Sequence, residues 1–512
     1  MIAAEPIVLE SFLAGRWIRG EGDGAALVDP ATGEVVAYAS AVGLNIEGAL
    51  RYAREVGRPA LRALRYAQRS EMLGRIADVL QARKDEWYEI AQRNSGNTRA
   101  DAAIDVDGAI GTLKYFAKAG AALGEAEFLA DGAPQRLARD PNFQGVHLGI
   151  PIEGAAIHIN AYNFPSWGLW EKAAVALLAG IPVVAKPATA TAWLAVAMTR
   201  AVVEAGILPA GALSLVAGST AGLLEFARFG DAIAFTGSAE TAEIVRSHPH
   251  VRGAGIRVNV EADSLNASLL GPDGAPGTAS FDLFVREVAR EMTSKAGQKC
   301  TAIRRALVPS EHIGAVAAAI GAAVDAVDEV APVVSPSSRA AVERGIGALA
   351  EEAAVVYRRG ARTGEAQAAF VAPVLLRTDA VADIAHDIEV FGPVATLVPY
   401  RGAEEAYDLA RRGGGSLVAS VFSADPSFLA ASAVALGATN GRVLLVDPSI
   451  GDSHTGHGIV LPSLRHGGPG RAGNGEELGG LRGLWFYHQH TAIQGSAAVL
   501  AELVSRAAEI AR

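Results

Sequence analysis

The chain has 512 residues, of which 50% are hydrophobic and 20% charged, and it carries a formal net charge of −10. A chain of this length outgrows a single hydrophobic core, so we expect two or three subdomains. Because no basic block and no apolar run of about 18 residues occurs, nucleic acid and membranes are not expected as partners, and small molecules are.

The first 150 residues predict a short strand-rich lead-in, then helices, then a projecting arm. The opening segment MIAAEPIVLESF has no basic region followed by an apolar one, so we expect no signal peptide and a cytoplasmic location. Helical apolar spacing covers Gln68 to Gln81 and Lys84 to Arg93. From Asp131 to Ile150 the chain is rich in Gly, Pro and Asp, which predicts an extended hairpin that leaves the body and pairs with a partner subunit.

Strands and helices alternate clearly between Gly154 and Val260. This pattern predicts a parallel, doubly wound sheet whose ligands lie beyond the carboxyl ends of its strands. The expected strands cover residues 154–159, 181–186, 212–218, 231–237 and 256–260. The expected helices cover Trp167 to Leu178, Ala190 to Glu204 and Ala221 to Ala227, with a further helix from near Ser238.

A second α/β region follows, with a glycine-rich tail. Expected helices cover Phe281 to Met292 and His312 to Val327, and expected strands cover Arg305 to Val308 and residues 394–400 and 441–447. The tail has a loop, RHGGPGRAGNGEELGG, then a strand over residues 484–495 and a final helix. We therefore expect a cofactor-binding domain (1–130 and 151–261), an arm (131–150 with 485–495), a catalytic domain (262–460) and a C-terminal segment (461–512).

Cys300 is the single cysteine, so the chain can form neither an internal disulfide nor a Cys-based metal site. A lone cysteine is either an inert apolar filler or a nucleophile. It lies in EMTSKAGQKCTAIRR, and positive charge from Lys295 and Lys299 would lower the pKa of its thiol. The count and the neighbours leave both readings open.

Two polar residues at predicted strand ends are further candidates. Glu261 follows the strand IRVNV, where partial burial would raise its pKa toward that of a general base, although a helix cap or a surface carboxylate fits its position equally. Asn163 lies in HINAYNFPSW, between a strand and a helix, where its amide can donate to a developing oxyanion or simply shape a turn.

Six segments in order, NAYNFPSW, IPVVAKPA, AFTGSAE, VNVEAD, GQKCT and EVFGPV, resemble the aldehyde dehydrogenase superfamily over nearly the whole chain. The resemblance implies an α/β fold with two doubly wound parallel-sheet domains and a β-hairpin oligomerisation arm, hence a homodimer or a dimer of dimers. It also implies that Cys300 is the nucleophile, Glu261 the general base and Asn163 the oxyanion donor. An aldehyde would be oxidised to an acid through a thioester, without a metal.

The same resemblance assigns cofactor positions. Lys186 would meet the adenosine ribose, Ser238 the pyrophosphate at a helix N-terminus, and Glu389 and Phe391 the nicotinamide ribose, with Tyr162 beside them. Thr189 stands where many NAD-using relatives carry Glu, so repulsion of a 2′-phosphate is removed and NADP is favoured. Ala242 stands where many relatives carry Gly, so the resemblance defines the geometry of the pyrophosphate contact less closely.

VEADSLN and HGGPGRAGNGEELGG depart from the usual family pattern and resemble a branch that acts on CoA-thioester semialdehydes from aromatic ring cleavage. The glycine-rich loop is then either the roof of a substrate tunnel or a surface turn. The tail and loop histidines are expected to be solvated rather than a metal cluster: His454, His457, His466, His488 and His490. A CoA-acylating enzyme, a silent binding protein and a thioesterase are the rival functions.

Overall fold

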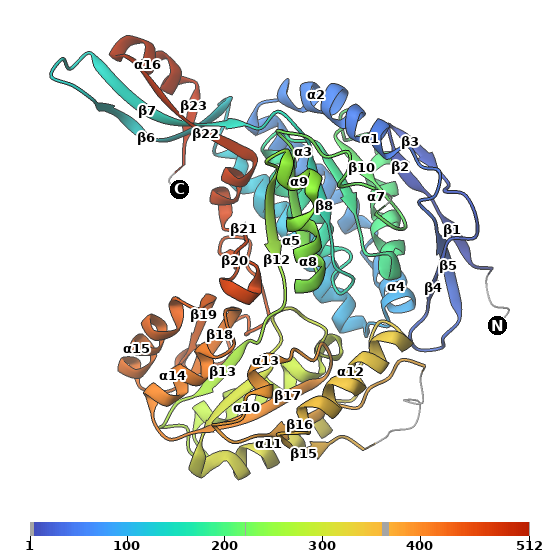
Figure 1. The fold of residues 1–512 in the computed structure, drawn as a ribbon, viewed down its shortest axis with the longest axis vertical. Coiled ribbons are helices and arrows are strands. Elements are labelled where there is room, and N and C mark those ends of the chain that lie inside the picture. The colour runs from blue at the N-terminus through green and yellow to red at the C-terminus, as the bar shows by residue number, and fades with distance from the viewer. Residues whose placement is uncertain (1–4, 221, 361–367, 511–512) are drawn as a thin grey trace.

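The structure is a computed structural model that describes residues 5–220, 222–360 and 368–510. Two bodies, each built on a seven-stranded sheet, lie one above the other, and a thin arm projects from the upper body (Figure 1). Each main sheet is parallel except at one edge, where antiparallel strands are added. The architecture is the expected α/β fold with two doubly wound sheets.

The first sheet has the order β12-β11-β8-β9-β10-β2-β3, and its first five strands run parallel. Its strands are β2 Ser11–Leu13, β3 Arg16–Ile18, β8 Ala156–Ile159, β9 Val183–Lys186, β10 Leu213–Leu215, β11 Ala232–Thr236 and β12 Arg257–Glu261. Alternate residues face opposite sides, so Ala156 packs under one helical layer and Ile157 under the other. Strands β8 to β12 match strands expected from the sequence, and β2 and β3 lie in the expected strand-rich lead-in.

Helices cover both faces of this sheet. One layer holds α3 Tyr66–Ala82, α4 Lys84–Ser95, α5 Arg99–Ala121, α6 Trp167–Leu178 and α7 Ala192–Glu204. The other holds α1 Ile46–Tyr52, η1 Ala53–Gly57, α8 Ala239–Ser247 and α9 Pro249–Gly253. Helix α2 Arg58–Arg62 follows η1, and η2 Thr189–Thr191 precedes α7.

The second sheet has the order β15-β16-β17-β14-β13-β18-β19 and is parallel except for β15. Its strands are β13 Ala267–Leu270, β14 Arg305–Pro309, β15 Ala354–Arg358, β16 Val374–Arg377, β17 Val394–Tyr400, β18 Ser416–Phe422 and β19 Asn440–Val446. Its helices are α10 Ala279–Thr293, α11 Ile313–Asp325, α12 Pro336–Leu349, α13 Ile384–Asp387, α14 Ala403–Arg411 and α15 Pro426–Gly437, with the short turns η3 Ser294–Gly297, η4 Ser310–His312 and η5 Pro448–Ile450.

The arm is a four-stranded sheet, β22-β7-β6-β23, capped by one helix. Its elements are β6 Phe128–Arg136, β7 Phe143–Pro151, β22 His488–Ser496, α16 Ala497–Ser505 and β23 Ala507–Glu509. Figure 1 shows the arm extending away from the body, as the sequence predicts. The outer edge of β22 has no partner strand within the described residues, so it is free to pair with another chain.

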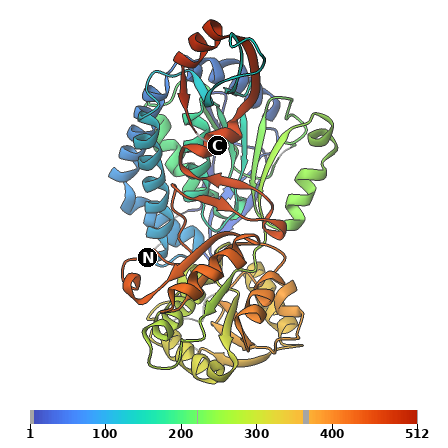
Figure 2. The same cartoon turned by 90° about the vertical axis from the view of Figure 1, so that its left-hand side faces the viewer.

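Short elements complete the fold. A small sheet near the N-terminus combines β1 Ile7–Leu9, β5 Val35–Ala39 and β4 Ala25–Val28. The C-terminal segment contains β20 Arg465–Gly467, η6 Gly470–Ala472, β21 Glu476–Leu478 and η7 Gly480–Tyr487. Figure 2 shows this red and orange segment crossing the junction of the two bodies. Across residues 5–220, 222–360 and 368–510, no helix combines the length and apolar character that crossing a membrane requires.

Two expected elements are wrong. Ala221 lies outside the described residues, and residues 222–226 form successive turns instead of a helix, beginning at Gly222 with φ +74°. The expected strand over 484–495 begins only at His488, because Gly479 and Gly480 take positive φ and start the 3-10 helix η7. In that helix Leu484 and Tyr487, three residues apart, both face the core.

Candidate active site

Two cavities meet at Cys300, at the junction of the two bodies. The larger, about 600 Å³, is lined by all nine residues singled out from the sequence: Tyr162, Asn163, Lys186, Thr189, Ser238, Glu261, Cys300, Glu389 and Phe391. The smaller, about 50 Å³, is lined by Asn163, Glu261 and Cys300 together with apolar side chains such as Phe164 and Trp167. The strand ends therefore bring distant segments to one place, as parallel sheets do.

A strained turn carries Cys300 into this junction. Lys295 and Ala296 in η3 have φ values of +51° and +50°, and Gly297 follows at +64°. A Cβ on Gly297 would collide with the carbonyl of Gly392, so only glycine lets the turn approach the segment just before β17. The turn is anchored by Asn266, whose Nδ2 donates to the Cys300 carbonyl oxygen at 2.8 Å.

The expected effect of the flanking lysines on Cys300 is wrong. Lys299 Nζ lies 2.7 Å from Glu291, and Lys295 Nζ donates to Asn97 at 3.3 Å, so both ammonium groups have other partners. Burial, and then the negative charge of Glu261, raise the pKa of the Cys300 thiol well above its ordinary value. The thiol is therefore protonated in the resting site.

Glu261 ends β12, which is an edge strand of its sheet rather than a central one. Burial acts to raise the pKa of Glu261, but His466 and Lys172 outweigh it and hold that pKa below its usual range, contrary to the sequence expectation. Its Oε2 lies 3.1 Å from Nε2 of His466. Its Oε1 is buried and has no hydrogen-bond partner among the described residues.

His466 is therefore a residue of the site that the sequence reasoning missed. It was expected to be solvated, yet it is 5% exposed, and the reacting atoms of Glu261, Cys300 and His466 lie within 4.8 Å of one another. His457 and His488 are likewise buried instead of solvated. No signal in the glycine-rich loop separates His466 from a surface histidine, because its burial depends on contacts far away in the sequence.

A buried cluster of charges lies behind Glu261. Lys172 Nζ lies 3.1 Å from Glu171 and 3.0 Å from Glu477. Burial acts to lower the pKa of Lys172, but Glu477 and Glu171 more than offset it and raise that pKa. Burial raises the pKa of Glu477 to about 7. A Glu-Lys pair within the otherwise apolar segment WGLWEKAAVALL was the available sequence signal for this cluster.

Two asparagines line both cavities beside Cys300. Asn163, in the loop between β8 and α6, faces the same space as Cys300 and Glu261. Asn160, which the sequence reasoning did not single out, is 4% exposed, and neither of its side-chain polar atoms has a partner among the described residues. A buried amide without partners costs free energy unless a ligand satisfies it, so Asn160 is a second candidate contact for a bound molecule.

The far end of the large cavity suits the phosphate of a nucleotide. Lys186, at the end of β9, is 8% exposed and has no ion pair among the described residues, and burial lowers its pKa to about 8. Thr189 Oγ1 donates to the Gly218 carbonyl at 2.7 Å. Ser238 caps α8, where its Oγ accepts from Thr241 N at 3.3 Å. Ala242 packs into the core of the sheet, so its methyl group points away from the cavity.

The near end carries Glu389, Phe391 and Tyr162. Glu389 accepts from Ser264 N at 3.0 Å and lies 3.3 Å from Nε of Arg304, and burial raises its pKa to about 7. The ring of Phe391 packs edge-on against Tyr162, with centroids 6.0 Å apart. Tyr162 accepts from Gln298 Nε2 at 3.2 Å, which holds the ring pair in the lining of the large cavity.

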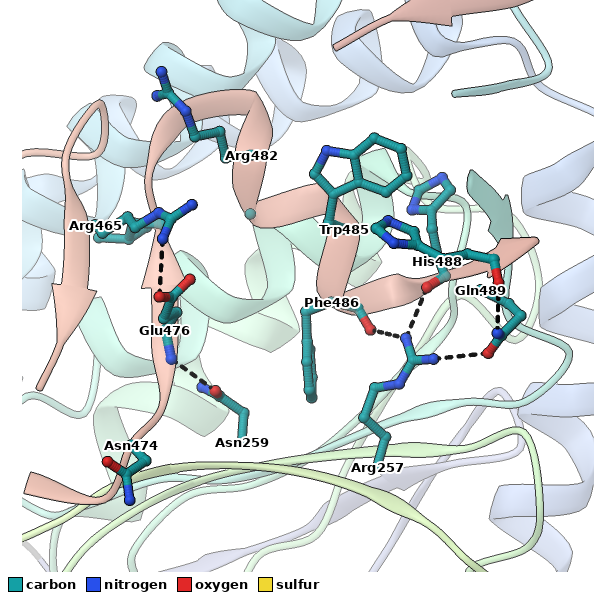
Figure 3. Close-up of a pocket in the computed structure, with 13 residues that line it drawn as sticks. Arg257, Asn259, Arg465, Asn474, Glu476, Arg482, Trp485, Phe486, His488 and Gln489 are labelled. Carbon is teal, nitrogen blue, oxygen red and sulfur yellow. Dashed lines mark hydrogen bonds and ion pairs between the residues drawn. The ribbon is translucent and has the colours of Figure 1, made fainter. Parts of the chain in front are cut away.

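The glycine-rich loop forms a β-hairpin whose two faces contact different surroundings. Strand β20 pairs with β21 so that His466 lies opposite Glu477, and both side chains turn toward the buried charges around Glu261. Arg465 and Glu476 turn the other way, toward a separate cavity of about 440 Å³ (Figure 3). In that cavity Arg465 pairs with Glu476, and Arg257 donates to the carbonyls of Phe486 and His488. Arg257 and Arg465 thus already have partners within the cavity.

The chain is similar to known enzymes over nearly its whole length. Residues 17–492 match the model of the family described as the aldehyde dehydrogenase family. It is 48% identical over 477 residues to a 3,4-dehydroadipyl-CoA semialdehyde dehydrogenase of Aromatoleum evansii, covering 90% of this chain and 93% of that protein. An alpha-ketoglutarate semialdehyde dehydrogenase of Haloferax volcanii is 31% identical over 81% of this chain and 86% of its own. The crystal structure of lactaldehyde dehydrogenase from Escherichia coli superposes with a TM-score of 0.82 at 22% identity, covering 96% of this chain and 99% of that one.

Proposed function

The chain belongs to the aldehyde dehydrogenase family, and we propose that it uses NADP to oxidise a CoA-linked semialdehyde to a carboxylic acid through a thioester on Cys300. One observation carries the proposal. A thiol, a carboxylate and two side-chain amides line the point where a large cavity that holds several polar side chains meets a small, mostly apolar one. The large cavity suits a dinucleotide and the small one suits the aldehyde end of a substrate.

The first half of the reaction depends on Cys300 and the amides. The Cys300 thiol is protonated at rest, so its proton is first released to solvent, and the Glu261 carboxylate stays ionised for the second half. The Sγ atom then adds to the aldehyde carbon, and the electron pair of the carbonyl moves onto its oxygen. Asn163 donates a hydrogen bond to that oxyanion together with the Cys300 backbone N–H. NADP, when bound, supplies the acceptor for the hydride, which leaves a thioester on Cys300.

The second half depends on Glu261. Its carboxylate accepts a proton from a water molecule, the water oxygen attacks the thioester carbon, and the carbon–sulfur bond breaks to release the acid and the Cys300 thiolate. Glu261 argues for water over CoA as the acceptor, because water needs a base more than a thiol does. A CoA-acylating reaction, in which CoA instead of water takes the acyl group from Cys300, is the second candidate function.

The cofactor preference rests on the far end of the large cavity. Lys186 offers an ammonium group without an ion-pair partner among the described residues, and Thr189 offers a neutral side chain beside it. A carboxylate at position 189 would repel a 2′-phosphate, whereas these two residues accept one. Ser238, Glu389, Phe391 and Tyr162 would hold the pyrophosphate and the nicotinamide half. We propose that the first-sheet body is the cofactor domain and the second the catalytic domain.

The substrate assignment rests on similarity. The relative from Aromatoleum evansii carries the name of a CoA-linked semialdehyde as its substrate, and 48% identity over 90% of this chain supports a substrate of the same class. The rival substrate is a simple aliphatic aldehyde or another semialdehyde, which the same chemistry would oxidise. The arm supports a homodimer or a dimer of dimers, and a cytoplasmic location stays a prediction.

The test is formation of reduced cofactor by the purified protein. A CoA-linked semialdehyde and simple aliphatic aldehydes are each offered with NADP and with NAD, and the acid or acyl-CoA product is identified. We expect the highest kcat/KM with the CoA-linked semialdehyde and NADP, and a free acid as product. Turnover of simple aldehydes alone would reject the substrate class, an acyl-CoA product would support the second candidate, and absence of turnover would reject the enzyme mechanism.

A further inference from the structure

His466 has no part in the chemistry described above, although it touches the candidate base. Its Nε2 lies 3.1 Å from Glu261 Oε2, and both side chains are almost completely buried, with 6% and 4% of their surface exposed. A buried imidazole beside a buried carboxylate is an ion pair when the imidazole carries a proton. Such a buried ion pair is stable only when the two charges hydrogen-bond to each other in good geometry, so each group depends on the other.

We propose that His466 is a positioning residue that keeps Glu261 ionised and holds its carboxylate toward Cys300. The inference rests on the proposed function, because it assigns His466 a role in the step in which Glu261 activates water. It does not make His466 a catalytic residue, since the imidazole acts through Glu261. His466 occupies Oε2, and the Cys300 thiol also lies beside the carboxylate at rest; once the sulfur is bound in the thioester, Oε1 is left for the water.

The hairpin β20–β21 is shaped to bring this imidazole against β12. A Cβ on Gly473 or Gly475 would collide with the carbonyl of Val260, the residue next to Glu261. Gly467, with φ +142°, approaches the carbonyl of Gly475 just as closely. Ala262 N donates to Ala472 O at 3.0 Å, which ties the hairpin to the chain on the other side of Glu261. These close approaches explain why residues 465–480 are rich in glycine.

The other charges around Glu261 cannot replace His466. Lys172 of α6 also faces Glu261, but its ammonium group lies between Glu171 of the same helix and Glu477 of β21. Cys300 is the remaining group that faces Glu261, and Glu171 and Glu389 add only negative charge near the thiol. Glu171 and Glu477 raise the pKa of His466, after Glu261 and against the effect of burial. Without the imidazolium, burial would therefore favour the neutral acid form of Glu261.

The test is the pH dependence of turnover in the full-length enzyme carrying His466→Gln or His466→Phe. Glutamine can donate a hydrogen bond but carries no charge, whereas phenylalanine has neither a hydrogen-bond donor nor a charge. Arg465→Gln is the matched control, because it removes the neighbouring side chain on the outer face of the same hairpin. Rapid mixing of each enzyme with aldehyde and NADP measures the burst of NADPH, and steady-state assays measure kcat from acid to neutral pH.

We expect the acid limb of the kcat profile to move upward by about 1–3 pH units in both His466 variants, the usual effect of one opposite charge on a carboxylate. Below the shifted limb, each variant should show a full NADPH burst followed by slow turnover, because only thioester hydrolysis is impaired. The Arg465 variant should keep the wild-type profile. A merely structural loss would reduce the burst amplitude at every pH and leave the limb in place.

A wild-type pH profile in both His466 variants would overturn the inference. A wild-type profile in the glutamine variant alone would also overturn it, because the charge of His466 would then have no role. A lowered burst amplitude with an unmoved limb would overturn it as well. Failure of the proposed function looks different, since the wild-type enzyme would then form no NADPH at all. The wild-type progress curve therefore separates the two failures.

Discussion

Replacing Glu261 with glutamine should stop the enzyme after one turnover. Glutamine keeps the size and shape of the side chain, and its amide oxygen can still accept from His466, but it cannot accept a proton from water. General base catalysis contributes about 10²- to 10⁴-fold to such a step, so the barrier to thioester hydrolysis should rise by about 3 to 5 kcal/mol. Steady-state kcat should fall by the same factor.

The first half of the reaction should survive this change. The negative charge of Glu261 raises the pKa of Cys300, so its removal favours the thiolate. The side chain is buried, and its reacting atom lies within 4.8 Å of those of Cys300 and His466. The variant should therefore form one NADPH per active site in a burst that is no slower than that of the wild type, and then stall with an acyl group on Cys300.

Rapid mixing with detection of NADPH measures the burst, and mass spectrometry of the quenched protein detects the acyl adduct. Glu476→Gln is the control, because that carboxylate lies on the outer face of the neighbouring hairpin and should leave kcat unchanged. Cys300→Ala should abolish the burst. Turnover of the Glu261 variant within about tenfold of the wild type would refute the role of the base, and loss of the burst would show that Glu261 is needed before hydride transfer.

Four further results are expected. Thr189→Glu should lower kcat/KM with NADP by about 100-fold through repulsion of the 2′-phosphate and improve the relative use of NAD; an unchanged NADP to NAD ratio would refute the cofactor argument. The affinity for NADP should fall as the pH drops through about 7, because the Glu389 carboxylate then gains a proton and accepts hydrogen bonds from the ribose hydroxyls less strongly. Binding titrations with Glu389→Gln should lose this pH dependence. Lys172→Met should lower the free energy of unfolding by about 3–5 kcal/mol, because Glu171 and Glu477 lose their buried counter-charge. An unchanged melting temperature would contradict this. Light scattering should give a mass of at least two chains, and a monomer would remove the proposed role of the arm.

Much of the fold follows from local pattern. The alternation between Gly154 and Val260 predicts β8, β9, β10, β11 and β12 and the helices between them, because a doubly wound sheet repeats one short unit. The region after Glu261, in contrast, alternates less regularly, and strands such as β16 and β18 were not expected. The turns at 222–226 and the helix η7 differ from expectation because glycines with positive φ override the apolar pattern.

Some residues of the candidate site could likewise be placed from the sequence, whereas others could not. Tyr162, Asn163, Lys186, Ser238 and Glu261 lie at or just beyond the ends of parallel strands, so motif and topology together predict one cavity for them. Their roles stay predictions, but their convergence needed no knowledge of long-range packing. Cys300 and Thr189 belong with them, since each lies in a segment that resembles the family.

Only the tertiary structure decides the charges around the reacting atoms. Sequence proximity suggested that Lys295 and Lys299 activate Cys300, yet their side chains turn to Asn97 and Glu291. His466, remote in sequence, became the partner of Glu261 through the fold of a glycine-rich hairpin. The physical reason is that electrostatic effects depend on distance and burial in space, whereas sequence patterns report only which residues share a strand or a helix.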